Sequence, residues 1–333
     1  MVHEASPEGS RTIAVTGSTG FVGRHVVREL LDRGFGVVAL ARDRQRASST
    51  LPQHDSLSIV EGDVFQGEAR DALLDGVDAC VHLIGIRREI RSKGVTFQRL
   101  HVDATRLMVE AATSRGVRRF VHMSSLGTRD EARSSYHKTK HASEMLVRHS
   151  TLDWTILRPS VIHGEGSEFV RLTQSCVLGQ AQPSFILPYF ESSTKTMDMV
   201  RPGESQGIGR LQPVAASDVA WCVGACLETD ATIGEIYPIG GPQAYTWPVM
   251  WEKIRDLTDG AKRSIKPWGV PAGVGIGLAR LASGLGMGEL LPFCESDVIM
   301  STEDNSCSNA KAHAHFGFSP KGFEESFVSY QRG

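Results

Sequence analysis

The sequence predicts an α/β fold: a doubly wound parallel sheet with helices on both faces, followed by a smaller, mainly helical C-terminal region. Short runs rich in Val and Ile recur through the first half of the chain, separated by stretches with helical periodicity. A glycine-rich loop joins the first of these runs to the first helical stretch. After about residue 165 the alternation stops, which separates the sheet from the C-terminal region.

The apolar runs are expected to form the strands of one sheet. Right-handed crossovers between parallel strands place the intervening helices on both faces. The helical stretches lie around 21–33, 68–75, 97–115 and 137–149. The predicted strands are Ile13–Thr16, Val37–Leu40, Leu57–Val60, Ala79–Ile84, Arg119–Met123, Trp154–Leu157 and Glu235–Ile239.

The chain is expected to divide into two parts. The sheet domain is expected to comprise residues 11–164 plus 211–245. A smaller substrate or partner region is expected to comprise residues 165–210 plus 246–330. Gly, Pro, Ser and Gln are frequent over 174–212, which predicts a long, mostly irregular excursion. Beyond it, Asp218 is expected to cap a helix.

Composition narrows the class of protein. Of 333 residues, 41% are hydrophobic and 22% charged, which is typical of a globular protein. A net charge of -2 gives no reason to expect nucleic acid or an anionic membrane as partner, so local charge is expected to matter more. No apolar run is long enough to predict a membrane span.

The N-terminus and the cysteines indicate the compartment. The first ten residues carry acidic side chains and lack the apolar core of a secretory signal, so a cytoplasmic location is expected. The six cysteines are scattered and form no Cys-x-x-Cys pair, which favours a reduced compartment and predicts no metal site.

The glycine loop predicts a dinucleotide site. Its first glycine permits the tight turn, its second lets the backbone approach a pyrophosphate, and its third allows the helix to pack closely on the strand. The helix N-terminus then presents free N–H groups to the phosphate. This is the Rossmann arrangement, and the residues expected to bind the cofactor here are Gly17, Ser18, Thr19, Gly20, Phe21, Val22 and Gly23.

The end of the second strand favours NADP(H). In NAD-binding proteins an acidic residue near this position hydrogen-bonds the ribose 2′-hydroxyl. Here Ala41 takes that position and Arg42 follows, so no acid repels a 2′-phosphate and a guanidinium can bind it. NAD(H) stays possible, because Asp43 would serve the ribose if the strand ended two residues later.

These motifs resemble those of the extended and atypical short-chain dehydrogenase/reductase superfamily, which is epimerase- and dehydratase-like. The matching segments are Thr16–Gly23, Gly62–Val64, His82–Gly85, Ser124–Ser125, Tyr136–Lys140 and Leu157–Gly164. Within the superfamily, the chain resembles the NADP(H)-binding accessory subunit of respiratory complex I. That likeness is carried by Val81–Ile86, Leu152–Ser160, Leu211–Val214, Gly240–Pro242 and Phe316–Pro320.

The resemblance implies further roles along the cofactor. Residues after the third strand would contact adenine, those after the fourth would lie along the cofactor, and those after the sixth would cover the nicotinamide. Tyr136 and Lys140 would also touch the cofactor, Lys140 through the ribose hydroxyls. The remaining residues implied to bind it are Asp63, Val64, Leu83, Ile84, Gly85, Pro159 and Val161.

The Tyr-x-x-x-Lys pair points to proton transfer at a carbonyl or an alcohol. Tyr136 and Lys140 are four residues apart and share one helix face. A nearby ammonium is expected to lower the tyrosine pKa from about 10. Tyr136 would exchange the proton and Ser125 would orient the oxygen, with Ser124 as the alternative serine, while the cofactor supplies the hydride.

Three other features depart from a simple enzyme pattern. His101 stands where the superfamily often has asparagine, and His163 could touch substrate or be an ordinary loop histidine. The segment 270–291 is apolar, with only Arg280 and Glu289 charged. It predicts either a contact with a protein partner or a membrane surface, or a buried helix pair above the substrate.

Three functions therefore stay open. The first is an NADP(H)-dependent oxidoreductase acting on a small-molecule carbonyl or alcohol, whose identity the motifs leave open. The second is a cofactor-binding structural or assembly protein with little turnover. The third is a sensor of the NADP(H) ratio that acts through a partner.

Overall fold

The centre of the computed structural model is a seven-stranded parallel sheet. Residues 11–182, 184–192, 207–285, 291 and 293–330 are described. The strand order is β11-β6-β5-β4-β1-β2-β3, and every neighbouring pair is parallel, so the chain winds outward from β1 in both directions. This confirms the predicted doubly wound fold. The strands are β1 (Thr12–Thr16), β2 (Gly36–Ala41), β3 (Leu57–Glu61), β4 (Ala79–His82), β5 (Arg119–Met123), β6 (Asp153–Pro159) and β11 (Glu235–Ile239).

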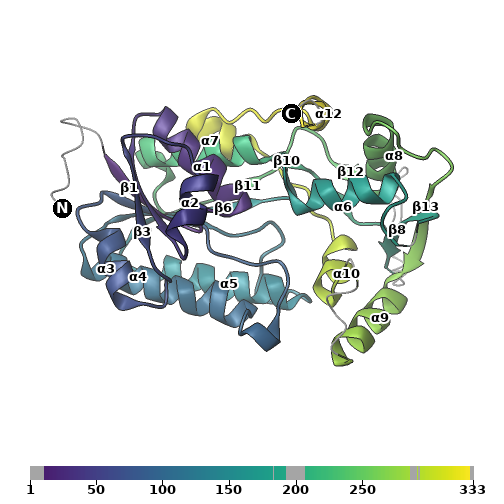
Figure 1. Cartoon of the computed structure of the whole chain (residues 1–333), viewed down its shortest axis with the longest axis horizontal. Helices are drawn as coiled ribbons and strands as arrows, with labels where there is room; N and C mark the ends of the chain where they lie inside the picture. The colour runs from purple at the N-terminus through teal and green to yellow at the C-terminus, as the bar shows by residue number, and fades with distance from the viewer. Residues whose placement is uncertain (1–10, 183, 193–206, 286–290, 292, 331–333) are drawn as a thin grey trace.

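Helices cover both faces of the sheet (Figure 1). On one face α1 (Phe21–Asp32) and α7 (Ala216–Glu228) pack against each other, and their buried side chains join those of the strands in one apolar core. A second core on the other face includes side chains of α3 (Gly67–Leu74), α4 (Ala104–Ser114) and α5 (Ser135–Arg148). The short α2 (Arg44–Thr50) follows β2.

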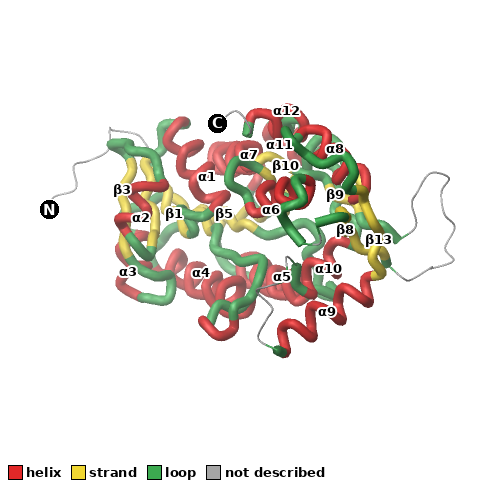
Figure 2. Tube along the Cα trace, turned by 45° about the vertical axis from the view of Figure 1, so that its right-hand side comes forward, coloured by secondary structure: helices red, strands yellow, loops and turns green. Residues whose placement is uncertain are grey.

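A third apolar core lies beyond the sheet. It is formed by α6 (Glu168–Val177), β8 (Ile186–Glu191), α8 (Trp247–Leu257) and α12 (Phe323–Ser329), among other segments. β8 pairs in parallel with β13 (Lys266–Pro271), and this pair lies at the opposite end of the molecule from β3 (Figure 2).

The expectation of a mostly irregular excursion over 174–212 is wrong for part of that range. The end of α6, all of β8 and the two-residue strand β9 (Arg210–Leu211) fall within it. The strand forms because Leu187 is buried in the third core and Phe190 packs on Phe293, although prolines and polar residues surround them in the sequence. Residues 193–206 lie outside the described residues.

The C-terminal segment contacts both the sheet and the third core. α11 (Ala310–Phe316) returns to the sheet, where His315 Nδ1 lies 2.8 Å from the Tyr237 hydroxyl and Lys311 pairs with Glu235. The remaining elements are η1 (Arg91–Lys93), η2 (Gln98–Asp103), η3 (Asp230–Thr232), β7 (Ile162–His163), β10 (Val214–Ala215), β12 (Tyr245–Thr246), α9 (Ala272–Gly284) and α10 (Glu295–Ser301). The division into the two parts named above stays a prediction.

Two local expectations need correction. α7 begins at Ala216 with Ala215 as its N-cap, so Asp218 lies inside the first turn and accepts the Lys321 backbone N–H at 2.8 Å. It therefore holds the C-terminal segment rather than capping the helix. A buried helix pair over 270–291 is also not what the described residues show, because α9 exposes several large apolar side chains.

Gly23 is expected to tolerate no side chain. A Cβ there would lie 2.1 Å from the Gly17 carbonyl oxygen and 2.6 Å from that of Ser18, so α1 could not keep its contact with the loop. Gly23→Ala should lower the free energy of unfolding by about 1–3 kcal/mol in urea denaturation, as overpacking does. Gly67→Ala is the matched control, because the nearest atom to its Cβ is 3.8 Å away. Equal stability of the two variants would contradict the close approach.

Candidate cofactor and catalytic site

The glycine loop lies against the end of β4. Gly17 has φ +71°, and a Cβ there would lie 3.0 Å from the Leu83 carbonyl carbon and 3.2 Å from the Ile84 nitrogen. The Gly20 N–H donates to the Gly17 carbonyl at 3.0 Å, which closes the turn. α1 then starts at Phe21 with no side chain capping its first N–H groups. A helix end of this kind can accept a phosphate.

Ser18 anchors this loop to the neighbouring strand. Its side chain is fully buried, and its hydroxyl donates to the Leu40 carbonyl at 2.9 Å. The hydroxyl therefore fixes the loop on β2, and only the Ser18 backbone can face a ligand. Thr19 and Phe21 in the same loop are partly exposed.

The end of β2 carries Arg42 and Asp43, the residues expected from the sequence to distinguish NADP(H) from NAD(H). Arg42 is exposed directly after the strand. The Asp43 carboxylate accepts the Arg46 backbone N–H at 2.9 Å and caps α2. One oxygen of that carboxylate is therefore used by the helix, whereas none of the described residues hydrogen-bonds the Arg42 guanidinium, and both residues are exposed. At the end of β3, the Asp63 carboxylate accepts the Phe65 N–H at 3.0 Å, and Val64 is buried beside it.

Lys140 is buried where β4, β5 and α5 meet. Its ammonium donates to the Met123 carbonyl, the last residue of β5, at 3.0 Å. A Cβ on Gly85 would lie 3.0 Å from Lys140 Nζ, so the glycine keeps the segment after β4 open beside the amine. Burial lowers the pKa of Lys140 to about 8, and the Glu144 carboxylate opposes that shift. Arg158 in turn pairs with Glu144 at 2.5 Å.

The Tyr136 phenol behaves differently from the expectation drawn from the sequence. Burial raises its pKa, while a side-chain hydrogen bond with Ser125 and the charge of Arg87 oppose the rise. The expected lowering by Lys140 is wrong for this structure, because burial dominates and the amine donates to Met123. Tyr136 is thus held as a neutral phenol.

The choice between the two serines also has a structural answer. The Ser124 side chain is almost fully buried, and its hydroxyl donates to Thr128 Oγ1 at 3.3 Å. The Ser125 hydroxyl, just beyond the carboxyl end of β5, donates to the Leu126 carbonyl at 3.2 Å and also acts to lower the pKa of Tyr136. The Leu126 N–H donates to the Pro159 carbonyl at 2.8 Å, which brings the end of β6 to the same place. Of the two serines, Ser125 is the one that acts on the pKa of Tyr136.

Buried histidines surround Lys140. His82 lies between Thr16 Oγ1 at 2.8 Å and Thr105 Oγ1 at 3.1 Å, and its ring stacks on that of His122 at 5.7 Å. Burial, with a smaller contribution from Lys140, lowers the pKa of His82 to about 3. These rings are therefore neutral and add no second charge beside the ammonium.

His101 joins the segment after β4 to α5. Its Nδ1 lies 2.9 Å from Thr139 Oγ1, and its Nε2 lies 3.0 Å from the Ile86 carbonyl oxygen and 3.1 Å from the Ile86 nitrogen. The ring also meets the Tyr136 ring edge-to-face at 5.3 Å. His101, which stands where the superfamily often has asparagine, therefore helps to position both α5, which carries Tyr136, and the segment after β4.

Arg87 is a residue that the sequence motifs did not single out. It bonds Glu168 of α6 and Asp297 of α10, each at 2.6 Å, and its charge acts on Tyr136. Both partners lie far away in the sequence, so no local spacing identifies them. The only feature of the sequence that could have indicated a role for Arg87 was its position two residues after Gly85.

His163 is structural. It is fully buried, its ring packs on Phe323 at 4.9 Å, and its Nδ1 lies 3.2 Å from the Tyr330 hydroxyl. Of the two alternatives left open for it, contact with a substrate is therefore not what the structure shows. The residue instead connects β7 to α12.

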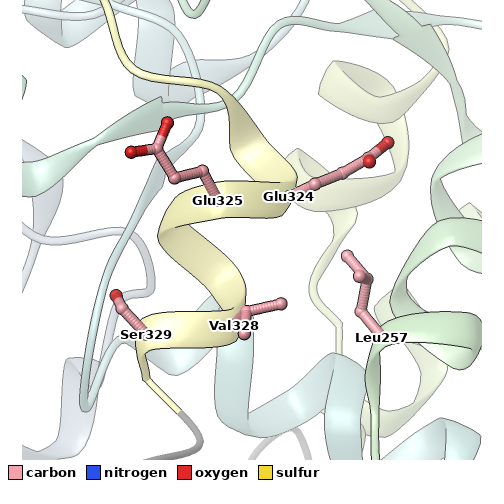
Figure 3. Close-up of a pocket in the computed structure, with 5 residues that line it drawn as sticks. All are labelled: Leu257, Glu324, Glu325, Val328 and Ser329. Carbon is pink, nitrogen blue, oxygen red and sulfur yellow. The ribbon is translucent and has the colours of Figure 1, made fainter.

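A surface hollow between α8 and α12 lies apart from these motifs (Figure 3). Figure 3 shows Leu257 on one helix facing Glu324 and Val328 on the other, while Glu325 points away from Leu257. Glu324 is paired with Lys253. None of the residues expected from the sequence to bind or react lines this hollow, whose fifth lining residue is Ser329.

Two kinds of feature are absent from the described ranges. No helix there is long and apolar enough to cross a membrane, and no group of three His, Cys, Asp or Glu side chains there could hold a metal ion. The cytoplasmic location stays a prediction.

The fold and the glycine loop together define a dinucleotide-binding protein of the Rossmann class. Residues 17–179 match a sequence family described as NAD(P)H-binding. This part of the chain, which is just under half of its length, is thus similar to NAD(P)H-binding domains.

Three curated relatives give the likeness more detail. A ceramide reductase of Caulobacter vibrioides is 32% identical over 216 residues, 63% of this chain and 60% of the relative. Subunit 9 of the NADH dehydrogenase [ubiquinone] 1 alpha subcomplex of Dictyostelium discoideum is 24% identical over 75% of this chain and 66% of the relative. A 3 beta-hydroxysteroid dehydrogenase/isomerase of Mycobacterium tuberculosis is 30% identical over 51% of this chain and 52% of the relative. The chain thus spans less than two thirds of each.

Solved structures share the fold over nearly the whole chain. A UDP-glucose 4-epimerase of Thermus thermophilus in complex with NAD has a TM-score of 0.68 at 19% identity and covers 97% of this chain and 99% of its own. The equivalent enzyme of Thermotoga maritima has a TM-score of 0.68 at 18% identity, with 96% and 98% covered. The resemblance to the extended short-chain dehydrogenase/reductase superfamily and to the complex I subunit is confirmed.

The lowered pKa of Lys140 predicts a rise in stability with pH. Between pH 8 and 10.5 the folded protein has lost this proton while the unfolded chain still binds it, so the free energy of unfolding increases with pH. The contribution is about 3 kcal/mol over that interval. Urea denaturation at both ends of the interval should show that Lys140→Met removes this part of the rise.

Lys138→Met is the matched control, since Lys138 is exposed on the same helix. It should leave the pH dependence unchanged. A wild-type slope that persists in Lys140→Met would show that the amine is not the titrating group.

Proposed function

We propose that the protein is an NADP(H)-binding oxidoreductase of the atypical short-chain dehydrogenase type. It would transfer hydride between the cofactor and a carbonyl or alcohol carbon, using Ser125, Tyr136 and Lys140. The observation that carries the proposal is that the Lys140 amine lies at the end of β5 beside Gly85, while Ser125, two residues beyond β5, acts on the Tyr136 phenol. Ligands of such sheets bind at the carboxyl ends of the strands.

The cofactor would lie across the strand ends from β3 to β6. Its pyrophosphate would sit on the uncapped start of α1, held by residues 17–23. Arg42 would bind the 2′-phosphate, because Asp43 is engaged in capping α2. Adenine would lie by Asp63 and Val64, and the rest of the cofactor would follow Leu83, Ile84, Gly85, Pro159 and Val161.

The raised pKa of Tyr136 suits the reducing direction. A bound nicotinamide supplies or accepts the hydride. A neutral phenol would donate its proton to the oxygen that gains charge as the carbonyl is reduced, and Ser125 would hydrogen-bond that oxygen. The buried ammonium of Lys140 would hold the ribose hydroxyls of the cofactor, because Gly85 leaves room for them beside the amine.

A second candidate is a structural or assembly protein that binds the cofactor with little turnover. The likeness to the complex I subunit, over 75% of this chain, favours it. The catalytic side chains would then serve cofactor binding alone. Turnover and its dependence on Tyr136 separate the two candidates.

Tyr136→Phe should abolish turnover while leaving cofactor binding nearly intact. With a panel of carbonyl compounds and NADPH, loss of the general acid should reduce kcat about 10²- to 10⁴-fold. Fluorescence titration with NADPH should give a Kd close to that of the wild type. If the wild-type protein binds NADPH but oxidises it with no compound of the panel, the assembly role replaces the enzymatic one.

Arg42→Ala tests the choice of cofactor. Loss of a charged hydrogen bond to a 2′-phosphate should weaken NADPH binding about 10- to 100-fold and leave NADH binding unchanged. Arg46→Ala is the control, because this exposed arginine lies on α2 rather than at the strand end. Equal weakening of both cofactors by Arg42→Ala would contradict the assignment.

A further inference from the structure

An apolar stripe runs along the outer side of α9. Val274, Leu278, Leu281 and Leu285 are 53%, 50%, 62% and 66% exposed. At 3.6 residues per turn their spacing places all four within about 60° of arc on the helix. We define these four residues as the α9 stripe. Isolated exposed leucines are ordinary, but a continuous line of them marks an interaction surface.

The stripe cannot turn inward, because the other side of α9 is committed to packing. Gly275 and Ala279 are buried, and a Cβ on Gly275 would lie 2.4 Å from the Phe190 ring. α9 also contacts α10, where Arg280 pairs with Glu295 at 2.6 Å. Small residues therefore face the protein and large apolar residues face outward.

Two exposed aromatic side chains lie at the same end of the molecule. Trp268, 64% exposed, belongs to β13, the strand that leads directly into α9. Phe185, 72% exposed, precedes β8, whose first residue Ile186 pairs with Lys266. Figure 1 shows β8, β13 and α9 together at one end, away from the sheet. Tryptophan and phenylalanine are side chains that favour the boundary between water and lipid.

The sequence segment that contains the stripe has only basic charged residues, although one of them, Arg280, is paired with Glu295 of α10. Between residues 260 and 285 the sequence has no Asp or Glu, whereas the whole chain has a net charge of -2. Four basic residues fall in this interval and all are exposed, namely Lys262, Arg263, Lys266 and Arg280. Basic side chains beside an apolar helix face are complementary to an anionic lipid surface.

We propose that the α9 stripe rests on the surface of an anionic phospholipid bilayer. α9 would lie in the plane of the interface with its leucines among the acyl chains, and the basic residues of 262–280 would contact the headgroups. α9 has 13 residues, which is too few to cross a bilayer, so the contact is peripheral. The geometry does not depend on the proposed enzymatic function.

Vesicle sedimentation of the full-length protein tests the proposal. We expect the protein to sediment with phosphatidylcholine vesicles that contain phosphatidylglycerol, more weakly with phosphatidylcholine alone, and less as salt is added. Leu278→Glu/Leu281→Glu should weaken binding at least about tenfold, because two apolar contacts become charged. Ile233→Glu/Val249→Glu is the matched control, at apolar residues 38% and 42% exposed elsewhere.

The basic residues are tested in the same way. Arg263→Glu/Lys266→Glu should reduce binding to the anionic vesicles and have little effect with phosphatidylcholine alone. Lys93→Glu/Arg133→Glu, at exposed positions elsewhere, is the control. Retained thermal unfolding and NADPH titration show that each variant is folded.

Three results would overturn the proposal. The first is a wild-type protein that does not sediment with anionic vesicles. The second is binding that the leucine variants leave unchanged, which would place the contact elsewhere. The third is a wild-type dimer in light scattering that Leu278→Glu/Leu281→Glu converts to a monomer without any vesicle binding, which would show that a second copy covers the stripe.

Discussion

The approach of the glycine loop to the end of β4 is the constraint on which the rest of the site depends. Gly17 lies so close to Leu83 and Ile84 that a Cβ would touch backbone, and Gly23 lets α1 press on the same loop. This contact fixes the start of α1 at the carboxyl edge of the sheet. The residues after β4, which reach Lys140 at Gly85, are placed by the same contact. These two close backbone contacts therefore set the positions of both the N-terminus of α1 and the segment that lies beside Lys140 of α5.

The electrostatics of the site are controlled by burial. Lys140 keeps a single backbone partner at Met123 and sits among neutral rings such as that of His82, so its ammonium is less stable than in water. The Tyr136 phenol is neutral for the same reason. Burial therefore moves the pKa of Lys140 toward neutral pH and moves the pKa of Tyr136 away from it.

Local patterns in the sequence were sufficient for the fold, while the site residues that they indicated stay predictions. The alternation of strands and helices predicted the parallel sheet, since parallel strands bring their carboxyl ends together whatever the helices contain. The strand β8 was not predicted, because its partner β13 lies far away in the sequence and because prolines interrupt the apolar pattern. The ion pairs of Arg87 with Glu168 and Asp297 were not predicted either, because both partners lie far away from Arg87 in the sequence. The direction of the Tyr136 pKa shift depends on burial, which spacing along a helix cannot reveal.

The Arg87 bridge has a mechanical consequence. Because one guanidinium holds both α6 and α10, the two helices cannot separate from the segment after β4 one at a time without leaving a carboxylate unpaired. Both pairs are partly exposed to solvent, so each is weak and is screened by dissolved ions. The stiffness of this junction is therefore expected to fall as ionic strength rises. Because α10 packs on α9, a displacement of α10 would also displace the α9 stripe. The same Arg87 pairs therefore link the α9 stripe to the segment that lies near Tyr136.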